Sequence, residues 1–214
     1  MGFLRAGLVS VCLASAVLAA PVSVPPALAA APRAPEEAPV VAAFERARGA
    51  LSAGRGAEVL GMLTKGSVAK LDAVRTAAHA GDGPSLDRLD SAGRFAALGL
   101  RRFLSPAELR RMKTGDIADV ALKKGWLGPN IISQAALGPV RVKGERANAV
   151  VLVDGRPSLV QADFMREGGQ WRIDLTQLFN TSSAMLDSFA AIAGKSERQF
   201  TDELLEKLAR KAVK

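Results

Sequence analysis

The 214-residue sequence contains no tyrosine, one histidine and one cysteine. The cysteine, Cys12, lies in an N-terminal segment that we expect to be removed, so the mature chain has neither a disulfide framework nor thiol chemistry. With one histidine and no mature cysteine, we expect no zinc or iron–sulfur site and no cofactor. Aromatic residues make up only 5% of the chain. This scarcity argues against a nucleic-acid partner, because readers of single strands stack the bases on aromatic rings.

The first 29 residues have the organisation of a signal peptide. Arg5 supplies a positive start, residues 6–20 form an apolar run, and Ala-Leu-Ala at 27–29 matches a signal-peptidase site. The apolar run is too short to span a bilayer comfortably. Val11 precedes Cys12, where a lipoprotein needs a small residue. We therefore predict an exported chain, periplasmic or secreted, with no transmembrane span after signal removal.

The charge balance is basic. Removal of Arg5 with the signal changes the formal net charge from +8 to +7. A basic exported protein favours anionic partners such as phospholipid head groups, cell-wall polymers or acidic proteins. The candidate surface for an anionic envelope component consists of Arg101, Arg102, Arg110, Arg111 and Lys113. The alternative is an ordinary solvated helix face.

Residues 30–39 combine three prolines with three charges and indicate a disordered leader. From Val40 to about Lys124, apolar residues recur at three- and four-residue steps, which is typical of amphipathic helices. The period then changes to two, and it returns to a helical pattern after Phe179. We predict an α+β fold, with a helical N-terminal half packed on a curved antiparallel four-stranded meander and with C-terminal helices. The domain spans 40–179, and a helical extension spans 180–214.

Two hairpin signals, Asp154-Gly155 and Gly168-Gly169, set the strand registers. The second predicts Phe164 opposite Ile173, Asp163 opposite Asp174, and Ala162 opposite Leu175. One sheet face is then apolar, and its three alanines leave space between larger side chains. The candidate pocket for an apolar small molecule consists of Ala147, Ala149, Ala162, Phe164, Ile173 and Leu175. Alternatively, the alanines let a helix approach closely.

The stretch "GGQWRIDL", residues 168–175, follows amphipathic helices and closes a meander in a chain with a signal peptide. In this it resembles exported members of the nuclear transport factor 2-like (cystatin-like α+β) superfamily. That resemblance implies helices over the concave face of a curved sheet, often with a small pocket between them. The superfamily includes isomerase-like enzymes, small-ligand binders and noncatalytic domains, so its fold does not settle function. The ending "WRIDLTQLFNTSSAMLDSF" is also similar to Mla-type periplasmic phospholipid carriers, although it lacks their tyrosines and glycine-bearing turn.

Asp163 and Asp174 are the sharpest candidates for acid–base or metal chemistry, because neighbouring carboxylates raise one pKa. The strand arginines, Arg146 and Arg172 among them, favour instead an exposed ladder of charges. His79 fits a solvated position at a helix C-terminus, and no serine has a histidine partner for a catalytic triad.

We therefore predict no catalytic residue and no metal ligand, and a noncatalytic module that binds a small ligand or a partner at the bacterial cell envelope, as a monomer or homodimer. The alternatives are a periplasmic apolar-lipid carrier and an isomerase- or dehydratase-like enzyme with a pocket carboxylate. Either the C-terminal helices or a second subunit would cover the apolar residues of the other sheet face, such as Val150 and Leu159.

Overall fold

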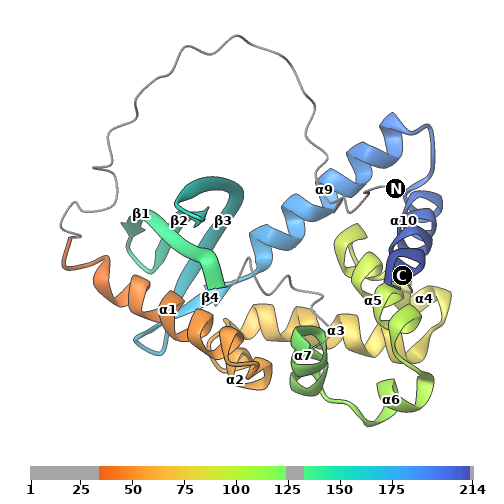
Figure 1. The fold of residues 1–214 in the computed structure, drawn as a ribbon, viewed down its shortest axis with the longest axis horizontal. Coiled ribbons are helices and arrows are strands. Elements are labelled where there is room, and N and C mark those ends of the chain that lie inside the picture. The colour runs from red at the N-terminus through yellow and green to blue at the C-terminus, as the bar shows by residue number, and fades with distance from the viewer. Residues whose placement is uncertain (1–33, 124–132, 213–214) are drawn as a thin grey trace, which may run out of the picture. The chain divides into compact units, whose positions relative to one another are not determined.

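The computed structural model describes residues 34–123 and 133–212 (Figure 1). The predicted signal peptide therefore lies outside the described residues. The first described range is helical, in agreement with its three- and four-residue periodicity. Its elements are α1 (Ala38–Ser52), α2 (Gly56–Leu60), α3 (Lys65–Ala80), α4 (Gly83–Asp87), α5 (Ser91–Phe103), α6 (Pro106–Arg111) and α7 (Thr114–Lys123).

Side-chain caps explain where several of these helices begin. The side chain of Asp90 accepts a hydrogen bond from the backbone of Gly93 at the start of α5. Ser105 and Glu108 form a reciprocal capping box at the start of α6, with Pro106 at its first position. These residues satisfy backbone N–H groups that have no partner within the helix. The boundaries of α5 and α6 thus follow from local sequence.

The predicted four-stranded antiparallel meander is confirmed. Its strands are β1 (Ala135–Lys143), β2 (Arg146–Val153), β3 (Arg156–Glu167) and β4 (Gln170–Asp174), paired in the order β1-β2-β3-β4. The fold is therefore α+β, with helices before and after one sheet.

Both predicted hairpin turns form, with positive φ at Asp154-Gly155 and at Gly168-Gly169. Positive φ at both central residues is the geometry that matches the twist of the flanking strands. Phe164 pairs with Ile173 and Asp163 pairs with Asp174, as predicted. The predicted pair of Ala162 with Leu175 is wrong, because β4 ends at Asp174 and Leu175 occupies the position just before α9.

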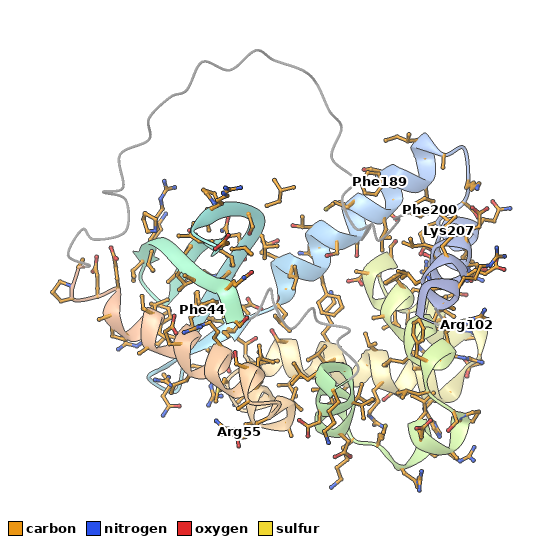
Figure 2. The ribbon with its side chains drawn as sticks, viewed as in Figure 1. Phe44, Arg55, Arg102, Phe189, Phe200 and Lys207 are labelled. Atoms are coloured by element: carbon orange, nitrogen blue, oxygen red, sulfur yellow. The ribbon has the colours of Figure 1, made fainter. Side chains whose placement is uncertain are left out.

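Helix α1 covers the apolar sheet face. Val40 and Ala43 of α1 share a buried cluster with Ala147, Ala149 and Phe164 of the sheet. Phe44 of α1 packs on the same cluster, and Figure 2 shows it among the side chains between α1 and the strands. The alanines on both sides allow the helix to lie close to the strands, so this layer is a packed core.

A second core lies among the helices α3, α5, α6 and α7. Its buried members are Val74, Ala77, Ala78, Ala97, Leu104, Leu109 and Ile117. A backbone connection joins the α2–α3 segment to the sheet: Ile173 donates to the Met62 carbonyl at 2.9 Å and Thr64 donates to the Ile173 carbonyl at 2.9 Å. The edge of the sheet is therefore extended by a segment about 110 residues earlier in the chain.

The chain ends in α9 (Thr176–Ile192) and α10 (Glu197–Ala212). The expected start of the helical extension at residue 180 falls inside α9. Helix α10 packs against α5 and α9. Val150 and Leu159 of the sheet remain exposed, Leu159 completely. The C-terminal helices thus leave part of the second sheet face open.

Candidate functional site

Five of the six residues of the predicted apolar pocket lie in the packed layer beneath α1. Ala147, Ala149 and Phe164 are buried, with Phe164 only 2% exposed. Ala162 and Ile173 pack against the same cluster. Leu175 packs with Val59 and Leu63 in a third cluster near the end of α1, so it is separated from the alanines. An apolar molecule would have to displace α1 to reach these side chains.

Asp174 is a structural anchor at the junction of the sheet, α3 and α9. Its Oδ1 accepts from the backbone of Thr176 at 3.0 Å and from the hydroxyl of Thr176 at 2.7 Å. The hydroxyls of Ser67 and Thr64 donate to the same oxygen at 3.2 and 3.5 Å. The prediction that arginines accompany this aspartate pair is wrong for the described residues. Arg172 instead donates to the Gly61 carbonyl, and Asp163 accepts from Gln161.

The two neighbouring carboxylates have opposite pKa shifts. Burial raises the pKa of Asp163 above its ordinary value of 3.8, and the nearby charge of Asp174 adds to that rise, against a hydrogen bond from Gln161. Burial alone would also raise the pKa of Asp174, but hydrogen bonds from Thr176, Ser67 and Thr64 together lower it below 3.8. Asp174 thus stays ionised through contacts that hold the fold.

The five predicted cations gather on two consecutive helices. Arg101 and Arg102 lie in the last turn of α5, Arg110 and Arg111 lie in the last turn of α6, and Lys113 is two residues beyond the end of α6. All five are exposed, and none forms an ion pair with a carboxylate of the described residues. We call these five residues the basic surface.

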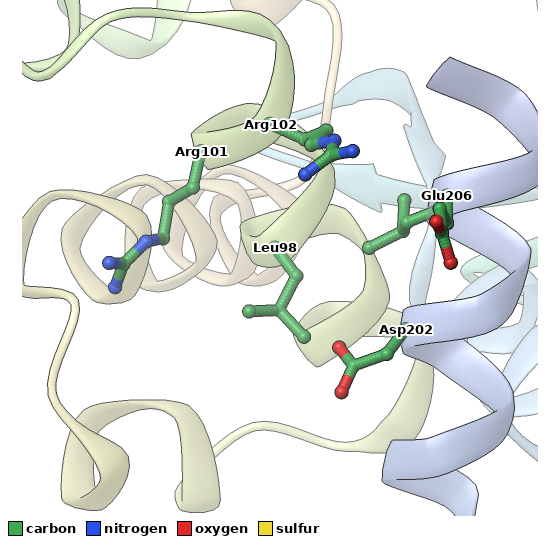
Figure 3. A pocket seen from close by; sticks show the side chains of 6 residues that line it. Leu98, Arg101, Arg102, Asp202 and Glu206 are labelled. Carbon is green, nitrogen blue, oxygen red and sulfur yellow. The ribbon is translucent and has the colours of Figure 1, made fainter. Parts of the chain in front are cut away.

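A groove of about 420 Å³ runs between α5 and α10 beside the basic surface (Figure 3). Its lining residues are Leu98, Arg101, Arg102, Asp202, Leu205 and Glu206. Figure 3 shows the guanidinium groups of Arg101 and Arg102 leaving α5 in different directions. The groove contains two carboxylates and two guanidinium groups, so its charge is balanced. Arg102 lowers the pKa of Glu206, although Arg210 is the main cause of that shift.

A smaller hollow of about 170 Å³ lies where the end of α3 meets α5 and α6. Its lining residues are Ala78, His79, Ala80, Gly81, Arg101, Leu104, Pro106, Leu109 and Arg110. Three of these carry nitrogen donors at the ends of their side chains, and none of the lining residues carries a carboxylate. Arg101 lines both the hollow and the groove, so it connects the two.

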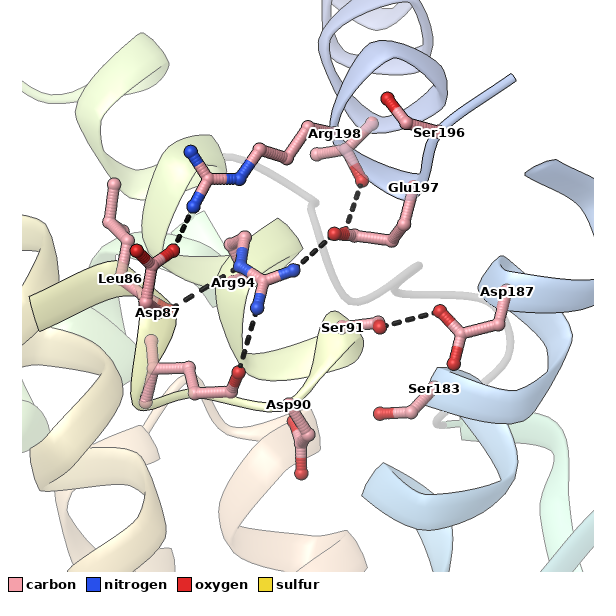
Figure 4. A network of polar contacts seen from close by, with 12 residues as sticks. Leu86, Asp87, Asp90, Ser91, Arg94, Ser183, Asp187, Ser196, Glu197 and Arg198 are labelled. Atoms are coloured by element: carbon pink, nitrogen blue, oxygen red, sulfur yellow. Dashed lines mark hydrogen bonds and ion pairs between the residues drawn. The ribbon is translucent and has the colours of Figure 1, made fainter. Parts of the chain in front are cut away.

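A polar network fixes α5 in place behind these features (Figure 4). Arg94 pairs with Glu197 at the start of α10, and each side chain is only 16% exposed. Arg94 also donates to the Leu89 carbonyl at 3.1 Å. Ser91 donates to Asp187 of α9 at 2.6 Å. The helix that carries Arg101 and Arg102 is therefore tied to both C-terminal helices.

The sequence identifies the arginines of this face, but it does not identify the residues that line the groove beside them. Leu98, Asp202 and Glu206 face the groove across two helices that lie about 100 residues apart in sequence. No local pattern connects them. His79 is exposed in the last turn of α3, as predicted, and it also lines the hollow with two arginines.

The described residues contain no group of three or more histidine, cysteine, aspartate or glutamate side chains able to hold a metal ion. Among the helices described, none is sufficiently long and apolar to cross a membrane. Comparison with known proteins finds no family model, no curated protein and no solved structure that matches the chain.

Proposed function

We propose that this protein is a noncatalytic binding module of the bacterial cell envelope that recognises an anionic component through its basic surface. The observation that carries the proposal is the exposure of Arg101, Arg102, Arg110, Arg111 and Lys113 near adjacent helix ends, with no salt bridge to a carboxylate of the described residues. Exposed cations attract anionic surfaces, and each adds about 1 kcal/mol near an anionic membrane.

The structural role of Asp174 supports a noncatalytic function. Its Oδ1 accepts hydrogen bonds from four donors, and no acidic residue is buried in the apolar sheet face beneath α1 or elsewhere among the described residues. An isomerase- or dehydratase-like enzyme would need a carboxylate inside such a face. The similarity to nuclear transport factor 2-like proteins is part of this proposal and rests on the order of elements, with a helix over one face of an antiparallel meander. Export rests on the N-terminal sequence.

Co-sedimentation with lipid vesicles tests the proposal. The full mature chain should bind vesicles of phosphatidylglycerol and leave vesicles of phosphatidylcholine in the supernatant. Changing the five residues of the basic surface to glutamine should reduce that binding more than 100-fold, at about 1 kcal/mol per residue. Equal binding to both kinds of vesicle would contradict the proposal.

A matched variant controls for net charge. It changes five exposed cations of the sheet to glutamine: Arg141, Lys143, Arg146, Arg156 and Arg166. Both variants lose the same formal charge, so long-range attraction falls equally in both. The proposal requires that the sheet variant keep most of its affinity. Equal loss in the two variants would mean that only the net charge matters.

A second candidate function, a periplasmic apolar-lipid carrier, is favoured by the exposed face of α9. Leu178, Met185, Phe189 and Ile192 lie within a narrow stripe of this helix, since their spacings are seven, four and three residues. All four are exposed, Phe189 by 49% and Ile192 by 83%, and Figure 2 labels Phe189 on α9.

Native mass spectrometry of protein purified from its own envelope tests this candidate. A carrier should retain a lipid, and a Phe189→Ser, Ile192→Ser variant should lose it while remaining folded. A Leu208→Ser variant, which changes an exposed apolar residue of α10, is the control. Lipid-free protein in every preparation would remove the carrier from consideration.

A further inference from the structure

We propose that the hollow between α3, α5 and α6 binds the phosphate group of a phosphate ester, with Arg101 and Arg110 as its principal ligands. This inference rests on the proposed function and specifies the chemistry of the anion. It also assigns the main contacts with the anion to two residues of the basic surface, Arg101 and Arg110, and not to the other three.

The composition of the hollow points to an anion. Arg101 and Arg110 supply guanidinium groups, and His79 adds an imidazole nitrogen. The other lining residues are alanine, glycine, leucine and proline, and none of the nine carries a carboxylate. Guanidinium groups present several N–H donors in a plane and bind phosphate oxygens in pairs. The neighbouring groove fits an anion less well, because Asp202 and Glu206 would repel it.

The size of the hollow is suitable for the same group. Its volume is about 170 Å³, whereas one water molecule needs only about 10–15 Å³ on the same measure. A tetrahedral phosphate with its ester oxygen fits in such a space. The rest of an ester would extend out of the hollow toward solvent or toward the groove, which shares Arg101.

The backbone at the end of α3 makes room for Arg101. Gly81 ends this helix with φ of 70°, a conformation that side chains rarely adopt. A Cβ at Gly81 would collide with the guanidinium of Arg101. Glycine at this position thus permits the arginine to lie against the helix end, where its charge is also favoured by the helix dipole. If Arg101 only capped the end of α3, Arg110 would have no reason to line the same hollow.

Titration of inorganic phosphate into the ¹⁵N-labelled mature chain, followed by NMR at constant ionic strength, tests the inference. We expect saturable shifts confined to amides near residues 78–81 and 101–110. The double variant Arg101→Gln, Arg110→Gln should weaken phosphate binding at least tenfold, because both charge-assisted contacts are lost. Shifts that do not saturate would overturn the inference.

The control changes the next residue in each helix, as Arg102→Gln, Arg111→Gln. It removes the same charge from the same helix ends but leaves the lining of the hollow intact. We expect less than a threefold loss of phosphate affinity in this variant. Equal weakening in the two double variants would refute a defined site. Thermal unfolding of both variants verifies that each is folded.

Two further ligands identify the source of the phosphate. Glycerol 3-phosphate represents a soluble ester, and vesicles of phosphatidic acid represent a lipid head group. If one of these ligands binds more tightly than inorganic phosphate, and only the Arg101→Gln, Arg110→Gln variant loses that binding, the result supports the hollow as the site. The ligand that binds more tightly then identifies the source of the phosphate. If phosphatidylglycerol vesicles bind while phosphate and both esters fail to, the hollow is refuted and the wider basic surface stands. If no anionic vesicle binds, the proposed function itself fails.

Discussion

Replacing Asp174 with alanine should destabilise the protein, whereas replacing its neighbour Asp163 with asparagine should not. Asp174 accepts two hydrogen bonds from Thr176 at the start of α9 and two from the hydroxyls of Ser67 and Thr64. Loss of such a contact at a helix start costs about 1 kcal/mol. After the substitution, the hydroxyls of Ser67 and Thr64 still hydrogen-bond to each other at 2.7 Å. The loss of their two hydrogen bonds to Asp174 therefore adds only about 1 kcal/mol more.

The total for Asp174→Ala is therefore about 2 kcal/mol, equivalent to a fall in Tm of about 4–8 °C for a chain of this length. Asp163 has a raised pKa because it is partly buried and faces Asp174. Its ionised form is thus disfavoured in the folded state at neutral pH. Asp163→Asn removes that charge and keeps an acceptor for Gln161, so it should stabilise the protein by about 0.5 kcal/mol or less, because solvent screens the site.

The pH dependence gives an independent check on the sign of each effect. The pKa of Asp174 is lowered on folding, so its stabilisation is present above 3.8 and is lost as the pH falls through the lowered value. The pKa of Asp163 is raised on folding, so the advantage of Asp163→Asn exists above the raised pKa and disappears below 3.8.

Urea denaturation of both variants and the wild type, between pH 3 and pH 7, measures these differences. A change below about 0.5 kcal/mol for Asp174→Ala would refute the anchoring role. A clear loss of stability in Asp163→Asn would refute the assignment of opposite signs. Either result would reopen a functional role for the carboxylate pair.

Three further predictions concern the pairing, packing and capping of the helices. Arg94→Ala removes the largely buried ion pair with Glu197, and it should lower the free energy of unfolding by about 2–3 kcal/mol in urea denaturation. Gly56→Ala places a Cβ 2.7 Å from the backbone carbon of Ala118. It should separate α2 from α7 and lower the Tm, at about 1–3 kcal/mol, whereas no change in Tm would contradict that close approach. Ser105→Ala removes the capping box of α6 and should cost about 1 kcal/mol; circular dichroism during denaturant unfolding measures the difference.

The sequence predicts those features that depend on residues close together in the chain. The turns at Asp154-Gly155 and Gly168-Gly169 need positive φ, and those residue types adopt it readily. The alternation of apolar residues then assigns each strand residue to a face, because side chains alternate across a sheet. The capping box at Ser105 is equally local. These signals suffice for the α+β fold and for the register of β3 with β4.

Other features depend on residues far apart in sequence, and no local pattern reports them. Asp174 meets Ser67 and Thr64 across 107 and 110 positions, so its arginine partners were predicted wrongly. Arg101 was recognised as a surface cation, but its position against Gly81 follows only from the packing of α5 on α3. Likewise, the alanines of the sheet fit either a pocket or a close helix, and only the position of α1 distinguishes the two.

Hydrogen–deuterium exchange of the mature chain, with and without phosphatidylglycerol vesicles, tests most directly where the protein meets an anionic partner. Backbone amides that become covered exchange more slowly, so the method maps the contacting segment. The account predicts slower exchange in residues 101–113, which contain the basic surface, and no change in α9. Protection confined to residues 178–192 of α9 would contradict it and would favour the lipid carrier.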